Sequence, residues 1–592
     1  MKQVSYLTTI VIFSVIGFVN SINGQYEVQS NFLKDPNIII PFIMDSADFW
    51  KKSVDWQDGG FYTEVKQDGT PELTSRKSFV QCSRHAYGFS RAFMVSGDEE
   101  YLNYAGHAIQ YVYDYGWDSQ NGGWFFSSDK TGNPAPPYGG GWDPNEGKWS
   151  FQQHYDVLGI SAMAEITRDK KHLEWFDKAV IFNDSLLWDS REGYEGYYDT
   201  ADKNWSNKRN KSFTSTVDAI TTWVLSRALL TNDQDDINRL IILADNIMDY
   251  LYESMFLNQV KIGFAESYNS NWTLNAESHA ASTGHVIKTA WCLARAYMYT
   301  QNDDYLVAAQ FMIDDMMDNG GYDYANGGLY GDLNWSTGSV NKSKNHWMLE
   351  QGLTGGLINY FLAEDIDDRD QNLELADGCI GFYMDHFIDQ TNGECYTQTN
   401  SLGTVTNNDK SDPFKGGYHN IEMAYLTYLY GNLFVQNKSV DLFYKFDATT
   451  ESRSIKMSPL AIVDDMLIIS EVSLDGVNYT DFDSKNRVLT IPAGVSGKYK
   501  ITYHLDGQVA TDEPHFSDEI FVSPNPAHND ISINNSGKDV SLAIYSTAGQ
   551  LMYSKDDIQN QQNIDISTFP NGMYIVELTS EGKTKFQKLI KH

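Results

Sequence analysis

The chain has 592 residues and a formal net charge of −35 at pH 7. A chain of this length is expected to form several domains, because single hydrophobic cores stop growing at about 250–300 residues. The acidity argues against a nucleic-acid partner, since phosphate binding requires a basic face. Aromatic residues make up 14% of the chain. Most of them are expected in the core, but this density beside acidic loops is also typical of a carbohydrate cleft.

The N-terminus reads as a secretory signal over residues 1–24. Lys2 gives a short positive start, residues 6–19 are mostly apolar, and residues 21–24 are small or polar enough for cleavage. The apolar run is too short for a membrane span, and no later stretch is apolar enough for one. An exported protein without a membrane span is therefore expected.

The cysteines predict neither a disulfide scaffold nor a zinc site, because they are few and lack CxxC spacing. Their apolar settings favour buried thiols, with pairing of two of them as the alternative in an exported protein. They are Cys82, Cys292, Cys379 and Cys395.

Residues 25–436 show helical segments broken by glycine–aromatic pairs about every 65 residues. This period fits one helical hairpin plus a β-loop per repeat. Six such hairpins can close a ring, which predicts an (α/α)6 barrel with its short β-loops gathered at one mouth. The expected inner helices span residues 83–95, 153–166, 216–230, 285–300, 349–363 and 421–433.

The pattern changes after the predicted barrel. Residues 437–507 contain short alternating runs separated by turn residues, which predict a small β-sandwich. Residues 508–518 form a polar linker, and residues 519–592 are expected to form a last β-domain.

The last domain resembles the C-terminal sorting domain of type IX secretion. The motifs that carry the resemblance are Val522-Ser-Pro-Asn-Pro-Ala527, Ile544-Tyr-Ser-Thr-Ala-Gly-Gln550, Phe569-Pro-Asn-Gly-Met-Tyr-Ile-Val-Glu577 and Lys588-Leu-Ile-Lys591. The resemblance implies a partnership with the type IX secretion machinery and export through the outer membrane to the surface or the medium.

Two histidines within the predicted barrel follow glycines and precede helical runs. His285 follows Gly284 in the stretch 283–291, and His419 closes the stretch 415–419 after a glycine pair. A histidine in the first turn of a helix can face a central cavity, and the positive helix N-terminus favours its neutral form. The alternative is that each histidine is satisfied by hydrogen bonds within a packing layer.

The helical region resembles the N-acylglucosamine 2-epimerase superfamily, most closely its cellobiose 2-epimerase branch. The motifs that match its inner helices, in order, are Lys77-Ser-Phe-Val-Gln-Cys-Ser-Arg-His-Ala-Tyr-Gly-Phe-Ser90, Phe151-Gln-Gln-His-Tyr155, Gly284-His-Val-Ile-Lys288, Lys344-Asn-His-Trp347 and Lys415-Gly-Gly-Tyr-His-Asn420. The resemblance implies a sugar epimerase that needs no cofactor or metal.

The chemistry of the residues supports epimerisation independently of the family resemblance. Inversion at C2 of an open-chain aldose needs a base on one face and an acid on the other, and histidines titrate near neutral pH. His285 and His419 are the predicted pair. Arg84 is a permanent cation suited to the anionic enediolate between the two proton transfers.

Several positions depart from the family pattern. Thr216 and Asp218 stand where relatives carry His-x-His, Lys288 replaces a glutamate, and Glu422 replaces an arginine. A family glutamate falls on Gln351, or on Glu350 if the register slips by one. Two tryptophans of relatives are replaced by Phe414 and Cys395.

Eight further residues are predicted to contact substrate. Lys288 and Glu422 each lie three residues beyond a site histidine, so both are expected near the cavity. They either form an ion pair of reversed polarity or contact the substrate independently. The full set is Gln153, Asp218, Lys288, Trp347, Phe414, Lys415, Tyr418 and Glu422.

Four functions are compatible with these residues. The leading hypothesis is a secreted 2-epimerase or isomerase acting on the reducing end of an oligosaccharide. A polysaccharide lyase acting on uronates is the alternative, with Arg84 or Lys288 neutralising the carboxylate. A glycoside hydrolase would need paired carboxylates, for which Asp218 and Glu422 are candidates. The non-enzymatic alternative is a surface glycan-binding protein.

Overall fold

The computed structural model describes residues 26–73, 76–135, 144–257, 262–275, 280–460, 462, 466–506, 520–534, 539–546, 550–558, 562–580 and 583–591. The predicted signal sequence (1–24) and the predicted linker (508–518) lie outside these residues.

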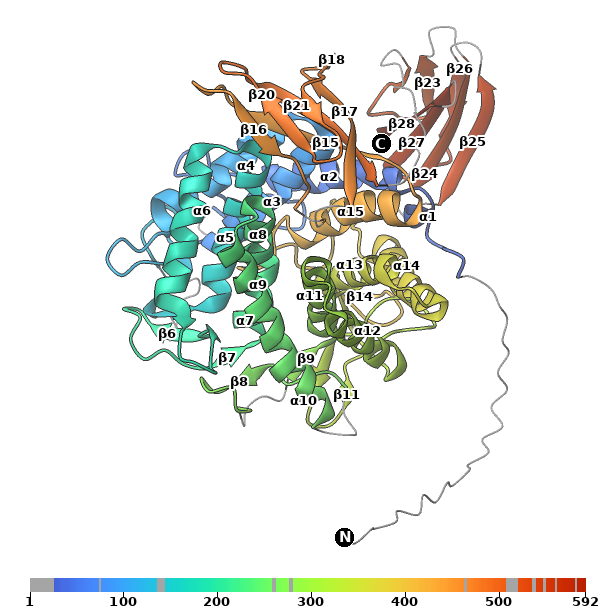
Figure 1. Cartoon of the computed structure of the whole chain (residues 1–592). Coiled ribbons are helices and arrows are strands. Elements are labelled where there is room, and N and C mark those ends of the chain that lie inside the picture. The colour runs from blue at the N-terminus through green and yellow to red at the C-terminus, as the bar shows by residue number, and fades with distance from the viewer. Residues whose placement is uncertain are drawn as a thin grey trace, which may run out of the picture.

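Six helical hairpins form the predicted (α/α)6 barrel (Figure 1). Neighbouring inner helices contact one another around the ring, and the last of them closes it against the first. The inner helices are α3 (Phe79–Ser96), α5 (Ser150–Thr167), α7 (Phe213–Ala219) continued by α8 (Leu225–Thr231), α11 (Thr283–Thr300), α13 (His346–Leu362) and α15 (His419–Tyr430). The outer helices are α2 (Ile40–Lys51), α4 (Glu99–Tyr111), α6 (Lys170–Phe182), α9 (Gln234–Asn246), α12 (Asp303–Asp318) and α14 (Ile366–His386).

The inner helices begin two to four residues earlier than the sequence predicted, and polar side chains cap α3, α7, α11 and α13. Ser78 accepts from the backbone of Gln81, and Asn345 accepts from that of Trp347. Such caps satisfy N–H groups that have no partner within the helix. The extra turn holds several of the residues that line the cavity described below.

Short antiparallel strands gather at this N-terminal end of the inner helices. They pair as β1 (Lys77–Ser78) with β2 (Ser127–Ser128), β3 (Gly147–Trp149) with β6 (Thr200–Asp202), β4 (Trp188–Asp189) with β5 (Gly196–Tyr197), and β7 (Lys211–Ser212) with β8 (Ser267–Tyr268). Two sheets have three strands: β9 (Ala280–Ser282), β10 (Asp332–Asn334) and β11 (Ser339–Val340); and β12 (Lys344–Asn345), β13 (Gln398–Thr399) and β14 (Val405–Asn407).

A buried lysine–aspartate ion pair recurs in five of these β-loops, a feature that the sequence analysis missed. Each aspartate begins the glycine–aromatic turn, and each lysine lies before or near the next inner helix, where its side chain is fully buried. The N–O distances are 2.8–3.0 Å in Lys77–Asp55, Lys148–Asp118, Lys211–Asp189, Lys344–Asp323 and Lys410–Asp389. These pairs fix the loops that form the mouth of the barrel.

A small β-sandwich packs against α3 and α5 through its first strand (Figure 1). One sheet has the order β15 (Val440–Phe446), β21 (Gly497–Leu505), β17 (Leu467–Leu474) and β18 (Val477–Asn478). The other has β16 (Arg453–Lys456), β20 (Val488–Ile491) and β19 (Phe482–Asp483). The amide of Leu460 donates to Glu165, which also pairs with Arg91 inside the barrel.

The C-terminal domain is a second sandwich with its own hydrophobic core. Its sheets have the orders β22 (Phe521–Ser523), β23 (Asp530–Asn534), β26 (Gln562–Asp565) and β25 (Leu551–Ile558), β24 (Val540–Ser546), β27 (Gly572–Ser580), β28 (Lys583–Lys591). The fold class predicted from sequence is therefore confirmed.

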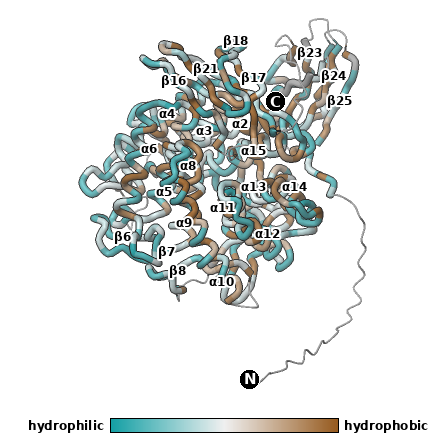
Figure 2. Tube along the Cα trace, in the orientation of Figure 1, coloured by the Kyte–Doolittle hydropathy of each residue, from teal (hydrophilic) through white to brown (hydrophobic). Residues whose placement is uncertain are grey.

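Hydrophobic and hydrophilic residues are mixed along the barrel helices and the C-terminal strands (Figure 2). In β15 burial alternates residue by residue, as expected for a strand with one face on the core. No helix in the described part of the chain is long and apolar enough to cross a membrane. The four cysteines are buried free thiols, which decides against the disulfide alternative.

Candidate active site

A cavity of about 650 Å³ opens at the N-terminal ends of the inner helices, within the usual range for small-molecule sites. Eight of the eleven predicted site residues line it. They are Arg84, Asp218, His285, Lys288, Trp347, Phe414, Lys415 and His419. Helices from opposite sides of the ring thus contribute to one site.

Three predicted substrate contacts do not line this cavity. The Gln153 amide exchanges hydrogen bonds with the backbone N–H and C=O of Trp124, so it fixes a β-loop. Tyr418 is buried between Tyr87 and Arg84. Glu422 accepts a hydrogen bond of 2.9 Å from the Tyr87 hydroxyl. These three side chains contact residues next to the cavity and do not face the cavity themselves.

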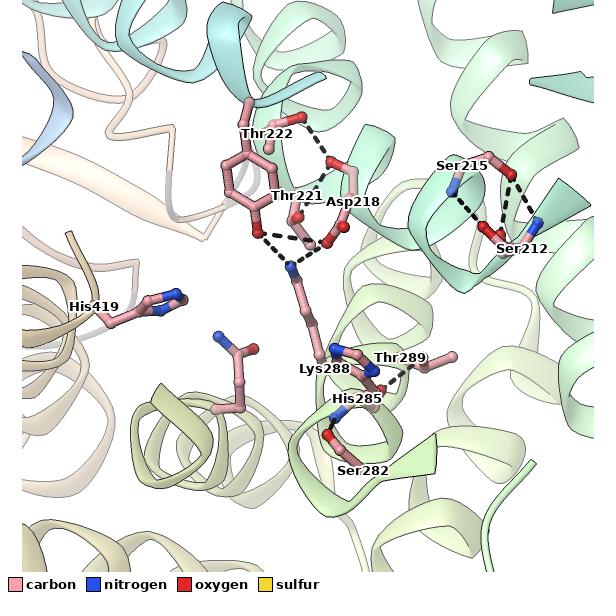
Figure 3. Close-up of polar contacts among 12 residues, drawn as sticks. Ser212, Ser215, Asp218, Thr221, Thr222, Ser282, His285, Lys288, Thr289 and His419 are labelled. Carbon is pink, nitrogen blue, oxygen red and sulfur yellow. Dashed lines mark hydrogen bonds and ion pairs between the residues drawn. The ribbon is translucent and has the colours of Figure 1, made fainter. Parts of the chain in front are cut away.

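His285 projects from the first turn of α11, where Ser282 caps the helix by accepting the His285 backbone N–H (Figure 3). Its Nδ1 lies 2.6 Å from the Glu266 carboxylate, and its ring stacks on Phe213 at a centroid distance of 3.9 Å. A carboxylate at Nδ1 accepts a hydrogen bond from the Nδ1–H group and leaves Nε2 as the ring nitrogen available for chemistry.

His419 begins α15 and lies across the cavity from α11 (Figure 3). Its Nδ1 lies 3.2 Å from Glu350, a buried residue of α13. Burial and then the positive charge of Arg84 lower the pKa of His419 well below its ordinary value, which favours the neutral ring. The two histidines therefore have the same arrangement, in which a glutamate at Nδ1 orients each ring.

Of the two residues that the fifth motif offers, Glu350 is the one that contacts His419. Gln351 accepts from the Trp291 indole and donates to Glu350, and it therefore orients that side chain.

Arg84 is a buried cation facing the cavity from α3. One guanidinium nitrogen donates to the Phe414 carbonyl, and the planar group stacks over Tyr155 at 4.1 Å from the ring centroid. Its Nε has no hydrogen-bond partner, and no carboxylate in the described chain forms an ion pair with it. The cavity thus holds a positive charge available to an anionic group of a ligand or intermediate.

Lys288 pairs with Asp218, not with Glu422 as one of the two sequence hypotheses proposed. Its ammonium lies 2.6 Å from the Asp218 carboxylate (Figure 3). The same ammonium lies 3.1 Å from the Tyr155 hydroxyl. Burial alone would lower the pKa of Lys288, but the Asp218 charge and Tyr155 raise it above its ordinary value. The reason is topological: α11 contacts α7, which carries Asp218, whereas α15 lies farther around the ring.

Lys415 lines the cavity but offers it no free donor. Its ammonium donates to the carbonyls of Cys395 and Asp409 and to the Thr397 hydroxyl, at 2.8–3.0 Å. All three N–H bonds are therefore used within the protein, and Lys415 fixes the loop before α15.

Sequence reasoning missed Glu266 and His346. Glu266 follows Phe264 by two residues in the fourth glycine–aromatic loop, and the same position in other loops gives Asp199 and Thr397, which line the cavity. This repeat position was the available signal. His346 belongs to the fifth motif and lines the cavity, with its ring centroid 6.0 Å from that of His419.

One group among the described residues has metal-ligand spacing. Donor atoms of Glu350, His419 and Glu422 lie within 4.8 Å of one another. Thr354 and Tyr87 already hydrogen-bond to the two carboxyl groups, so the cluster is satisfied as a hydrogen-bonded network.

Two histidines with a glutamate at each Nδ1, a buried arginine and aromatic side chains thus surround one cavity at the mouth of an (α/α)6 barrel. The model of the N-acylglucosamine 2-epimerase (GlcNAc 2-epimerase) family matches residues 60–422. The chain belongs to this family. The model of the secretion system C-terminal sorting domain matches residues 521–592.

Similar proteins agree with this assignment. The cellobiose 2-epimerase of Dictyoglomus turgidum is 23% identical over 412 residues, covering 66% of this chain and 94% of the relative. The D-mannose isomerase of Marinomonas mediterranea is 21% identical, covering 62% and 90%. The solved cellobiose 2-epimerase of Bacillus thermoamylovorans is 20% identical with a TM-score of 0.56, covering 66% of this chain and 98% of that one.

The sorting domain is expected to be dispensable for the chemistry. No described residue beyond His419 lines the cavity, and the C-terminal sandwich has its own core. A chain ending at Asp506 should therefore retain the kcat/KM of the full chain. Loss of activity in the folded truncated protein, as judged by circular dichroism, would show that the last domain supports the site.

Proposed function

We propose that this protein is an exported sugar 2-epimerase or isomerase that acts on the reducing end of an oligosaccharide without a cofactor. The observation that carries the proposal is the pair of histidines, His285 and His419, which face one cavity from different inner helices. Each has a glutamate at Nδ1, which leaves Nε2 for the substrate. A single-base enzyme would not need two such arrangements.

In the proposed reaction the sugar binds in its open-chain form, with the C2 proton made acidic by the C1 carbonyl. One histidine removes that proton, and the other returns a proton to the opposite face of C2. The enediolate between the two steps is anionic, and Arg84 is the unpaired buried cation of the cavity that would stabilise it. An isomerase would instead return the proton to C1 and give a ketose.

The cavity walls support a carbohydrate substrate. Trp149, Phe151, Trp347 and Phe414 line it, and such rings stack on the C–H faces of sugars. Phe414 is 39% exposed, so its ring is accessible for stacking on a second sugar unit in the proposed complex. The sorting domain supports a substrate met outside the cell.

Solvent isotope exchange tests the proposal. The full chain is incubated in heavy water with reducing oligosaccharides, including cellobiose, mannobiose and a uronate-containing oligosaccharide, and followed by NMR and ultraviolet absorbance. Deuterium at C2 with interconversion of the two epimers is the expected result, and a ketose product would identify the isomerase. An unsaturated ultraviolet chromophore or chain shortening without exchange would overturn the proposal in favour of a lyase or a hydrolase.

Arg84→Lys is expected to lower kcat by about tenfold or more while the barrel stays folded. Lysine keeps the charge but loses the planar fork that both donates to Phe414 and stacks on Tyr155. Arg91→Lys is the matched control, because Arg91 is equally buried on α3 but pairs with Glu165 outside the cavity. Full activity of Arg84→Lys would show that a point charge suffices.

A further inference from the structure

Two carboxyl groups lie together behind His419. Glu350 contacts its Nδ1 at 3.2 Å, and Glu422 lies one helical turn farther along α15. Donor atoms of the three residues lie within 4.8 Å of one another, and Glu350 is 1% exposed. Glu350 is fully and Glu422 partly buried, and ionising both carboxyl groups at this separation carries an electrostatic cost that favours one proton held between them.

We propose that Glu350 and Glu422 share one proton, and that this proton holds His419 in the tautomer whose Nε2 carries hydrogen and faces the cavity. The catalytic consequence rests on the proposed function: His419 then acts as the acid and His285 as the base on the free enzyme. Glu422 is a positioning residue, because it acts through Glu350.

The surrounding charges place the proton mainly on Glu350. Burial raises the pKa of Glu422 too, but the Tyr87 hydrogen bond and the charges of Lys288 and Arg91 oppose that rise. Lys288 acts on both carboxyl groups, so Tyr87 and Arg91 are what distinguish Glu422 from Glu350. Burial and then the Glu422 charge raise the pKa of Glu350 well above its ordinary value. The titratable and charged groups facing the cluster are Arg84, Tyr87 and Arg91 on α3, Lys288 on α11, His346 on α13, Tyr383 on α14, and Tyr418 and Tyr425 beside or on α15.

The hydrogen bonds at Glu350 fit a protonated acid. Its Oε1 accepts from the Thr354 hydroxyl at 2.9 Å, as a carbonyl oxygen does. Its Oε2 lies against His419 Nδ1 and also accepts from the Gln351 amide, whose orientation is fixed by Trp291. A proton on Oε2 donated to Nδ1 leaves hydrogen on Nε2.

The Glu266–His285 pair differs from the Glu350–His419 pair in its solvent exposure and in its neighbouring carboxyl groups. The His285 and Glu266 side chains are 28% and 20% exposed, against 11% and 1% for His419 and Glu350. The nearby carboxyl group of Asp332, which interacts with His285 and Glu266, lies at an exposed position of β10, and no described three-residue donor group of this kind includes Glu266. In the proposal Glu266 accepts a hydrogen bond from the Nδ1–H of His285, which leaves Nε2 as the basic ring nitrogen.

The proton balance closes over one turnover. The C2–H bond breaks as His285 Nε2 takes the proton, and the enediolate forms. His419 Nε2 then gives its proton to C2, while the Glu350 O–H bond breaks and Nδ1 gains that proton. His419 is neutral before and after the step, Glu350 becomes a carboxylate beside Glu422, and His285 becomes an imidazolium next to Glu266. After the product leaves, His285 releases its proton to solvent and Glu350 takes one from solvent, which relieves the pair of carboxylates and restores the starting state.

NMR of the full chain with ¹⁵N-labelled histidine tests the tautomer directly and needs no substrate. Couplings between ring nitrogens and carbon-bound ring protons identify the protonated nitrogen, and His419→Gln assigns the signal. At pH 7 the wild type is expected to show Nε2–H, converting to Nδ1–H at higher pH as Glu350 ionises. Nδ1–H at pH 7 would overturn the proposal.

Glu422→Gln is the informative variant, because its amide oxygen still accepts from Tyr87 while the negative charge is lost. The pKa of Glu350 then falls, so the tautomer should convert at a pH lower by about one unit or more. The alkaline limb of kcat/KM should move with it. Glu266→Gln, the same change at the other histidine, should leave the His419 conversion in place. An unchanged conversion pH in Glu422→Gln would overturn the shared proton.

The two proposals fail separately. If no sugar exchanges deuterium but the tautomer and its shift are as expected, the proposed function is wrong and the shared proton stands. If exchange occurs while Glu422→Gln changes neither the tautomer nor the pH profile, the epimerase stands and the shared proton is wrong.

Discussion

Substitution of glutamine for His285 or for His419 is expected to lower the rate of epimer interconversion by about two orders of magnitude or more. Each loss removes a proton-transfer group from one face of C2, and general acid–base catalysis contributes about 10²–10⁴-fold. Glutamine fills a similar space and can still hydrogen-bond to Glu266 or Glu350. The barrel should therefore stay folded, and the loss should appear in kcat.

The two variants should also differ in a way that a structural defect cannot mimic. With one histidine left, the epimer whose C2 proton faces that histidine should still exchange with solvent, whereas the other epimer should not. His172→Gln is the control, because His172 hydrogen-bonds to Tyr113 from outer helix α6, away from the cavity lining. Near-full interconversion in either site variant would remove that histidine from the mechanism.

The barrel could be predicted from sequence because its signals are local and repeated. Glycine–aromatic loops at a regular period and long apolar helical patterns identify six hairpins. The helix starts were placed late because the capping residues, such as Ser78 and Asn345, lie before the apolar pattern begins. Apolar periodicity locates the body of a helix, whereas its first turn depends on single polar side chains.

The sequence identified residues that line the cavity, but it did not identify the side chains that orient the two histidines. His285 and His419 stand in recognisable motifs, but Glu266 is 19 residues before His285 and on a different element. The ion-pair partner of Lys288 on another helix was harder still to predict from the sequence. Lys288 and Glu422 have matching offsets from their histidines, yet the contact of α11 with α7 brings Lys288 to Asp218 instead. Helical offsets fix the face of a helix and leave open which neighbour it meets.

Loss of the Lys288–Asp218 pair is expected to be the most destabilising single change in the cavity. Both side chains are 5% exposed and their charges lie 2.6 Å apart. Lys288→Met leaves the Asp218 carboxylate buried without its cation, and Asp218→Asn leaves the ammonium buried without its anion. Removing one partner of a buried pair costs about 3–5 kcal/mol in the free energy of unfolding.

The pairing itself is measured by a double-mutant cycle on the urea unfolding transition of the barrel. Lys288→Met combined with Asp218→Asn should be more stable than the sum of the single losses predicts, with a coupling energy above about 1 kcal/mol. The reference cycle combines Lys288→Met with Glu422→Gln and should show a smaller coupling, because Glu422 hydrogen-bonds to Tyr87 and not to Lys288. Additive losses in the first cycle would contradict the pair. A larger coupling in the second cycle would instead favour the ion pair of Lys288 with Glu422.

The pH dependence of stability gives a second measurement of the pair. Asp218 raises the pKa of Lys288, and the pair stabilises the fold only while Lys288 is protonated, so the Lys288 contribution should persist through neutral pH. It should be lost only as the pH rises beyond about 10.4 and through the higher pKa of the folded state.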